Sequence, residues 1–298
     1  TQLFFAMADG GKLSDEDTIK LVRKFLTAAP PGEFREVLKD VRKLVENDGL
    51  LDSHLPAIAR EYNQEQLQAV AVPGADYQVL LCQAGEIDAD HIFDPQGAQV
   101  LTVDHVSLEC RDPRPAEDGE RCAEGEDYRA AAQKAVSAYS YEFYREGVCG
   151  AYCKRNGDGS LTVTVAISGT KLSPRNFWSG RCRSVWTFNF NGGASGASVT
   201  GSVNVLVHYY EDGNVQMAAN RDFTGDISFG SPEEFGAAIK TFLTTHETKY
   251  QTSLDAEYVN MQENTFKSLR RKMPMSQTRF QWHLISKYKL ADELAAGK

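Results

Sequence analysis

Residues 198–229 read SVTGSVNVLVHYYEDGNVQMAANRDFTGDISF, and two runs of alternating apolar and polar residues flank the turn Glu211-Asp212-Gly213-Asn214. A period of two residues is typical of a strand with one buried face. The Asp-Gly pair supplies the positive φ angle that a tight hairpin needs. The stretch therefore predicts an antiparallel hairpin with strands over Ser198–Tyr210 and Val215–Phe229.

The same alternation continues upstream of this hairpin. Turns at 156–159 and 191–193, both rich in Asn and Gly, separate three more predicted strands: Val148–Lys154, Leu161–Ile167 and Arg183–Phe190. Five strands joined by short turns indicate an antiparallel meander. They lack the strand–helix alternation of a Rossmann or barrel enzyme.

Helical periodicity marks the regions on both sides of the meander. Three short amphipathic helices are predicted at the N-terminus, over Ser14–Ala28, Phe34–Val45 and Leu51–Tyr62, and tight turns between them favour an antiparallel bundle. A fourth helix is predicted over Tyr128–Tyr144. Ser231-Pro232 begins a fifth, which keeps an apolar face for roughly 30 residues.

The length of the fifth helix bears on assembly. Thirty residues span about 45 Å at 1.5 Å per residue. Five strands spaced about 4.8 Å apart cover only about 20–25 Å. A helix laid across them would expose part of its apolar stripe unless the sheet continues into a second subunit. The pattern therefore favours a sheet completed by a partner.

Residues 65–125 have a different sequence pattern, with short strands and a polar loop. Tyr77–Cys82 and Ala98–Val103 predict short strands, and Asp112-Pro113-Arg114-Pro115 is interpreted as the start of a polar loop that runs to about Gly125. The whole chain is predicted to be α+β, with five parts in order: a loose leader (1–12), a helical stalk (13–64), a small β globule and loop (65–125), a central antiparallel sheet with its long helix (126–263) and a C-terminal tail (264–298).

Composition fits a soluble protein with a real core. The 298 residues are 42% hydrophobic and 24% charged. No run approaches the roughly 18–20 apolar residues that cross a bilayer. Leu3–Ala8 resembles a short secretion segment but has no positive flank, so we expect either that Met7 lies close to the natural start or that residues 1–12 are a loose leader. The six cysteines are too sparse for a disulfide framework and show no second pair at zinc spacing, which favours free thiols in a reducing cytosol.

Charge is strongly segregated along the chain. Residues 266–298 contain eight Lys or Arg and two acids, a net charge of +6, whereas the first 265 residues carry −15. The run Phe266–Pro274, FKSLRRKMP, is the densest basic block. Folding alone gives no reason for such segregation, so the tail is predicted to meet an acidic surface.

The outer tail is also amphipathic. Past Pro274, Phe280, Leu284 and Tyr288 recur at helical spacing, with Trp282 and Ile285 beside them. Such a segment can lay an apolar face into a groove on a partner. In the basic block, Lys267 and Arg271 would be neighbours one turn apart on a helix.

Three other groups of residues have a composition that could suit a functional site. His208 with Glu211 and Asp212 has the residue types of a metal or acid–base site, but the spacing favours a structural turn. Asn156–Ser160 resembles part of a calcium loop but lacks its closing Glu, so a hairpin turn is favoured. Asn176-Phe177-Trp178 and Trp186 lie near arginines, yet the acidic total argues against nucleic acid and favours core or interface packing.

Two motifs resemble signatures of the F-actin capping protein alpha subunit family. Val207–Val215 (VHYYEDGNV) is similar to one, and Phe266–Pro274 to the other, with Ser268 and Met273 as departures. Further islands match in order over roughly residues 14–290: Ala29–Phe34, Asp112–Pro115, Asn176–Arg181 and Tyr250–Thr252.

The resemblance implies a mushroom-shaped heterodimer with a beta subunit, in which two sheets join into one and a long helix from each chain crosses it. It implies a non-enzymatic, calcium-independent cap on the barbed end of actin filaments, held by mobile C-terminal tails and needing no cofactor. Actin-related filaments are possible targets too. The resemblance further implies that acidic regulatory proteins and phosphoinositides compete for the basic face, and that peptide motifs wrap the stalk. The expected location is the cytoplasm and its cytoskeleton.

Ten tail residues are therefore candidates for actin binding: Lys267, Arg270, Arg271, Lys272, Arg279, Phe280, Trp282, Leu284, Ile285 and Tyr288. Seven more form the structural turn motif: His208, Tyr209, Tyr210, Glu211, Asp212, Gly213 and Asn214. Gln277 stands where the family has a basic residue, and Lys272 stands where it often has an uncharged one. The alternative function is a peripheral adaptor that rests its basic amphipathic tail on anionic lipid.

Overall fold

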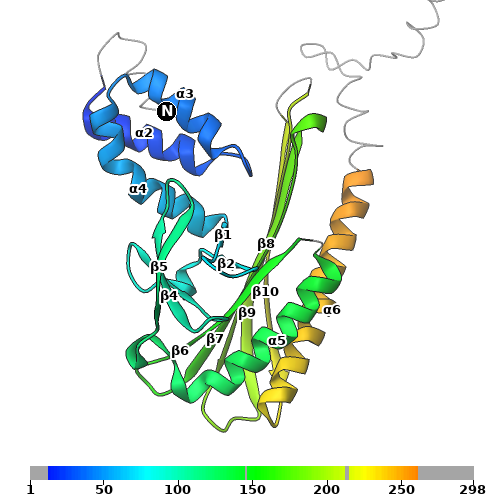
Figure 1. Cartoon of the computed structure of the whole chain (residues 1–298). Coiled ribbons are helices and arrows are strands. Elements are labelled where there is room, and N and C mark those ends of the chain that lie inside the picture. Colours follow the sequence, from blue (N-terminus) through cyan, green and yellow to red (C-terminus); the bar gives the residue numbers. More distant parts are fainter. Residues whose placement is uncertain (1–12, 145, 212–214, 261–298) are drawn as a thin grey trace, which may run out of the picture. The chain divides into compact units, whose positions relative to one another are not determined.

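The computed structural model describes residues 13–144, 146–211 and 215–260 (Figure 1). The chain divides into two compact units, residues 1–242 and residues 243–298, and the boundary falls within helix α6 (Pro232–Asn260). The predicted leader and C-terminal tail lie outside the described residues. Among the helices that are described, none combines the length and the hydropathy needed to cross a bilayer.

Three helices form the stalk: α2 (Asp15–Thr27), α3 (Phe34–Val45) and α4 (Asp48–Glu65). Side-chain caps begin two of them, because Ser14 Oγ accepts from Asp17 N at 3.2 Å and Asn47 Oδ1 accepts from Leu50 N at 3.1 Å. Their facing apolar stripes bury a shared core that includes Leu26, Leu51, Leu55 and Ile58. The three predicted helices are confirmed, and α4 begins earlier and ends later than its apolar pattern indicated.

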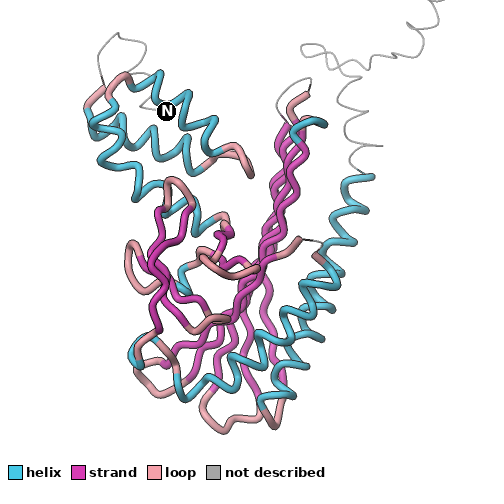
Figure 2. The backbone as a smooth tube through the Cα atoms, viewed as in Figure 1, coloured by secondary structure: helices cyan, strands magenta, loops and turns pink. Residues whose placement is uncertain are grey.

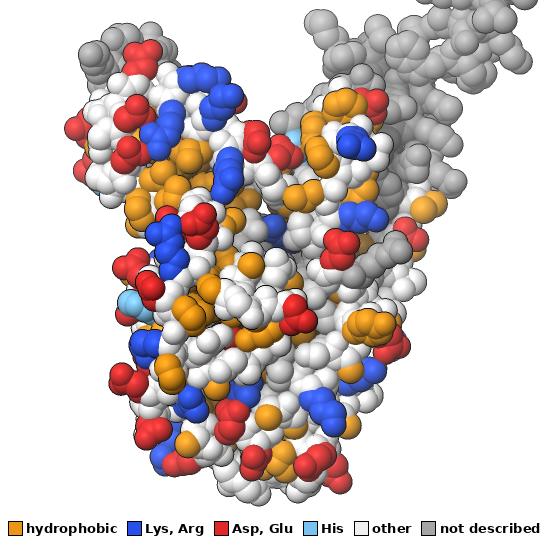
Figure 3. Space-filling model, in the orientation of Figure 1, with side chains coloured by type: hydrophobic (Ala, Val, Ile, Leu, Met, Phe, Trp, Pro, Cys, Tyr) orange, Lys and Arg blue, Asp and Glu red, His pale blue; other side chains and the backbone are white. Residues whose placement is uncertain are grey.

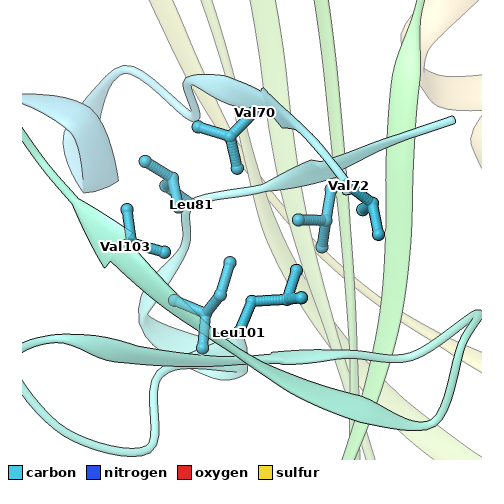
Figure 4. Close-up of a cluster of buried hydrophobic side chains, with 7 residues drawn as sticks. Val70, Val72, Leu81, Leu101 and Val103 are labelled. Atoms are coloured by element: carbon cyan, nitrogen blue, oxygen red, sulfur yellow. The ribbon is translucent and has the colours of Figure 1, made fainter. Parts of the chain in front are cut away.

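The β globule follows the stalk and contains two small sheets. One pairs β1 (Ala69–Ala71) with β2 (Gln78–Leu80), and the other has the order β3 (His91–Asp94), β4 (Gln99–Asp104), β5 (Glu109–Pro115). Valine and leucine side chains from both sheets point toward one another and form its core (Figure 4).

The interpretation of Asp112–Pro115 as the start of a loop is wrong, because these residues end strand β5. The register shifts between Val100 and Thr102, and Asp112 has a φ of 50° in the bulge opposite that shift. β5 is an edge strand, where prolines are tolerated because one side of the strand needs no donors. A bulged, polar edge strand has no alternation for a sequence pattern to detect.

The predicted five-stranded antiparallel meander is confirmed. Its strands are β6 (Val148–Arg155), β7 (Leu161–Ser173), β8 (Trp178–Phe190), β9 (Gly196–Tyr209) and β10 (Val215–Ser228). They pair in the order β10-β9-β8-β7-β6. The β7–β8 hairpin is longer than predicted at the end that contains residues 168–182. Asn156–Ser160 forms the hairpin turn between β6 and β7, as predicted, with Asn156 N donating to Ser160 O at 2.8 Å.

One face of the sheet is covered by helix α5 (Glu126–Phe143) and the first turns of α6, and the stalk lies on the other side (Figures 1 and 2). The helix-side face is aromatic. Phe188 and Phe190 contact Phe235, and Trp186 lies with its ring centroid 5.7 Å from that of Phe242. This packing leaves the opposite face of the sheet as the side on which the stalk meets the strands.

Gly201 of β9 makes room for the buried Trp186. A Cβ at position 201 would lie 2.2 Å from Cε3 of that indole. Gly201→Ala is therefore expected to lower the free energy of unfolding by about 1–3 kcal/mol, the usual effect of overpacking a core. Urea unfolding followed by tryptophan fluorescence measures this loss. Gly192→Ala is the matched control, because no atom lies within 4 Å of a Cβ there; equal midpoints for the two variants would contradict the expectation.

Candidate functional site: the stalk–sheet junction and the open sheet edge

The predicted site residues fall into two groups. All ten candidate actin-binding residues belong to the tail and lie outside the described residues. Of the turn motif, His208, Tyr209, Tyr210 and Glu211 are described, whereas Asp212, Gly213 and Asn214 are not. The described part of the candidate site is therefore the end of strand β9 and what it contacts.

His208 joins the sheet to the stalk. Its side chain is buried, with 4% of its surface exposed, and Nδ1 lies 2.7 Å from Oε1 of Glu33, the residue that precedes α3. Ser179 Oγ of β8 donates to the same carboxylate oxygen at 3.4 Å. Glu211 instead pairs with the Tyr209 hydroxyl. In these described contacts His208 and Glu211 have different partners, which supports the structural interpretation of this motif. In residues 13–144, 146–211 and 215–260, no three His, Cys, Asp or Glu side chains gather closely enough to hold a metal.

The turn between β7 and β8 packs onto the same end of β9. Phe177 adopts a left-handed conformation with a φ of 55°, and its carbonyl accepts from Tyr210 N at 2.9 Å. The two rings meet edge to face with their centroids 6.0 Å apart. Trp186 lies fully buried in the core, as expected, whereas Phe177 keeps 43% of its surface exposed.

The stalk contributes the third side of this junction. Tyr62 Oη of α4 donates to Pro30 O at 3.2 Å, and burial raises the pKa of that phenol. A hollow of about 480 Å³ lies between stalk, globule and sheet, and its lining includes Tyr62, His105 and Arg181. Figure 3 shows this side of the molecule in space-filling form. Three stretches far apart in the sequence, 29–34, 176–181 and 207–211, therefore meet at one place and fix the stalk against the sheet.

Glu33→Ala tests this junction. Removing the carboxylate takes away the acceptor for His208 and Ser179, so the free energy of unfolding is expected to fall by about 1–3 kcal/mol, the cost of unpairing a buried polar group. Chemical denaturation measures the change. Glu36→Ala, one turn further along the exposed face of α3, is the control and should leave stability unchanged. Equal losses in the two variants would show that the junction contributes nothing specific.

The two edges of the central sheet differ. Strand β6 is flanked by β2 of the globule and by α5, and Tyr152 Oη of β6 donates to Leu80 O at 3.4 Å. Strand β10 is the opposite edge and pairs, in the described sheet, with β9 alone over fourteen residues. A long open edge presents a row of backbone donors and acceptors that can pair with another chain. β10 is therefore the edge available for a further strand.

None of the six cysteines, all of which lie within the described residues, forms a disulfide. Cys149 and Cys153 face the same side of β6, but their neighbours differ: Cys149 lies near Gln133 and Ser137 of α5, and Cys153 Sγ lies 3.2 Å from Cys122 Sγ. Burial raises the pKa of both thiols. This favours protonated, unreactive side chains over metal ligands.

Some residues at this site carry no signal in the sequence. Glu33 lies inside the island Ala29–Phe34, but nothing in its sequence neighbourhood indicates a partner 175 residues away. Arg181 ends the island Asn176–Arg181 and Arg183 begins a predicted strand, but neither position indicates that the two side chains share a hollow. Their alternation along β8, two residues apart, is the signal that places both side chains on one face.

Comparisons with known proteins agree with this architecture. The family model described as F-actin capping protein alpha subunit matches residues 22–293. The F-actin-capping protein subunit alpha of Dictyostelium discoideum is 36% identical over 283 residues, covering 94% of this chain and 99% of the relative. The Arabidopsis thaliana protein of the same name is 32% identical, covering 95% and 94%.

A solved structure also shares the fold. It is the homodimeric actin capping protein alpha subunit from Plasmodium berghei, which superposes with a TM-score of 0.70 at 17% sequence identity. The match covers 80% of this chain and 92% of the other.

Proposed function

The chain belongs to the F-actin capping protein alpha subunit family, and from this premise we propose that it caps the barbed end of actin filaments, blocking both addition and loss of monomers without calcium. The observation that carries the proposal is the family match, which extends over residues 22–293 and therefore includes stalk, globule, sheet and tail. The lipid-adaptor alternative finds no support in the relatives. Capping by steric block needs no catalytic group, nucleotide or metal.

We further propose that a capping protein beta subunit completes the sheet at β10. The open edge supports this, because pairing there would satisfy its backbone groups. The Plasmodium berghei relative is described as homodimeric, so a second copy of this chain is the alternative partner. The long apolar helix predicted from Ser231 onward would then extend over strands of both subunits. We also propose domain boundaries at 12/13, 64/65, 125/126 and 263/264, which separate the leader, the stalk, the globule, the sheet with its long helix, and the tail.

The tail is proposed to hold the filament end. The guanidinium group of arginine binds carboxylates in a bidentate manner, and arginine is frequent among interface hot spots. The apolar face of the outer tail would bind in a groove on actin. The opposite charges of tail and target would speed docking. The same basic face would be the point of competition for acidic regulatory proteins and phosphoinositides. We also propose that peptide motifs bind along the stalk and that actin-related filaments are further targets. The proposed location is the cytoskeleton of the cytoplasm.

A seeded elongation assay tests the function. The chain is co-expressed with a beta subunit, and the dimer is added to filament seeds at substoichiometric amounts with excess actin monomer. Barbed-end elongation is expected to stop at dimer concentrations near that of the ends, with and without calcium. Undiminished elongation with a correctly assembled dimer would contradict the proposal.

A further inference from the structure

A second hollow lies on the stalk-side face of strands β8, β9 and β10. Its volume is about 410 Å³, and its lining is mostly polar or small: Gln66, Arg181, Arg183, Asn204, Val205, Leu206, Ala218, Ala219 and Asn220. The hollow therefore runs from the end of the stalk helix α4 to the open edge of the sheet.

Sheet register explains the alignment of these side chains. Arg183 pairs with Asn204, and Asn204 pairs with Asn220, so one polar row crosses three strands to the edge. Directly opposed residues share a face. The neighbouring row contains Arg181, which pairs with Leu206. Both guanidinium groups thus lie on the face that carries the stalk.

Arg181 is held by neutral groups only. It is 5% exposed, and its nitrogens donate to Thr170 Oγ1 at 2.9 Å, Gln66 O at 3.1 Å and Gln68 Oε1 at 3.1 Å. None of these acceptors carries a charge. Burial lowers the pKa of this guanidinium, yet arginine stays protonated in proteins.

The guanidinium group of Arg183 has fewer hydrogen-bond partners than that of Arg181. Its Nη1 atom is buried and has no hydrogen-bond partner among the described residues, and burial lowers its pKa. Glu65 attracts this charge through space, but the two residues do not form an ion pair. In the same hollow, Oε1 of Gln66 is also buried without a donor, and this residue is 6% exposed. The side chains of Arg181, Arg183 and Gln66 therefore line one hollow, and neither arginine is paired with an acidic side chain in the described structure.

Buried charges without a counter-charge are costly, and a carboxylate is the group that a guanidinium fork fits best. We propose that this hollow is a carboxylate-binding site, occupied in the assembled dimer by an acidic side chain of the subunit that extends the sheet at β10. The inference rests on the proposed function, because it requires that partner.

The position of the hollow favours the partner over a free anion. Its lining reaches residues 218–220 of β10, so a chain that pairs with this edge borders it directly. Three strand spacings of about 4.8 Å separate β8 from an added strand, or about 14 Å, which is too far for a side chain on that strand. The acidic residue therefore comes from a partner segment that lies over the stalk-side face.

Arg183→Met in the co-expressed dimer tests the assignment, because it removes the charge and keeps much of the volume. With a partner carboxylate in the hollow, the variant leaves that carboxylate buried and unpaired, so subunit association is expected to weaken by a factor on the order of 100. Subunit exchange with a labelled chain measures this. A hollow filled only with water predicts equal or tighter association, since a buried unpaired charge has been removed; that result would overturn the inference.

Two further variants and a phosphate experiment distinguish a partner carboxylate from a small anion. Arg183→Lys keeps the charge without the fork and is expected to weaken association less than Arg183→Met does. Arg175→Met, at an exposed turn, is the matched control and should leave exchange unchanged. If inorganic phosphate stabilises the wild-type dimer but not Arg183→Met, and exchange is unaffected, the site binds a small anion and the partner assignment is wrong. Failure of the wild-type dimer to cap filaments would instead contradict the proposed function.

Discussion

Replacing both Lys267 and Arg271 by alanine is expected to weaken capping by several kcal/mol, the scale of a pair of interface hot spots. The two residues would be neighbours at i and i+4 in a helical tail, so they would present adjacent charges to the same acidic surface. Removing them takes away both electrostatic attraction and hydrogen-bond donors. The fold should be unaffected, because neither residue belongs to the described stalk, globule or sheet.

Capping affinity is measured by seeded elongation over a range of dimer concentrations. Lys39→Ala with Lys43→Ala is the matched control: it removes two cations at the same i and i+4 spacing from the exposed side of stalk helix α3. That variant should cap like the wild type. Wild-type affinity in the tail variant, or equal losses in tail and stalk variants, would show that the tail is not the anchor.

Expression of the chain without a partner is expected to give no stable monomer. Strand β10 leaves a fourteen-residue edge open, and an edge of that length templates association with other chains. Size-exclusion chromatography with light scattering should therefore show aggregates or a self-associated species. Co-expression with a beta subunit should give a soluble one-to-one dimer.

The outcome that contradicts this expectation is a monodisperse monomer at micromolar concentration. A well-defined homodimer would support pairing at an edge but would replace the beta subunit by a second copy. The two partners can be distinguished by adding the beta subunit to that homodimer, because a preferred heterodimer would displace the second copy.

Much of the fold was predictable because its strands alternate. The run from Ser198 to Phe229 predicted strands β9 and β10, because apolar and polar residues alternate along it; residues 212–214 of its predicted turn lie outside the described residues. Strand β5 escaped detection because its bulge at Asp112 and its two prolines interrupt any period of two. The extra length of the β7–β8 hairpin escaped for a related reason: the face that is buried there carries the polar residues Ser168, Ser179 and Arg181, so no apolar alternation marks it.

The site was predictable in part. Charge segregation alone marks the tail, and the motif at Val207–Val215 marks the end of β9. Nothing in one sequence indicates that His208 meets Glu33, because pairing across so many residues depends on how the stalk docks. Arg183 illustrates the same limit: alternation predicts its face, but only the packed structure shows that its Nη1 lacks an acceptor.

The contact between Glu33 and His208 spans 175 residues, and this has a consequence for synthesis. At about 5–20 residues per second, a ribosome needs roughly 10–35 seconds to make the intervening chain. The three N-terminal helices can meet one another early, but they must wait undocked until β9 emerges. Contacts of such high sequence separation form late and slowly. During this interval the nascent chain therefore exposes surface that is buried in the finished protein, and this surface is what a chaperone would cover.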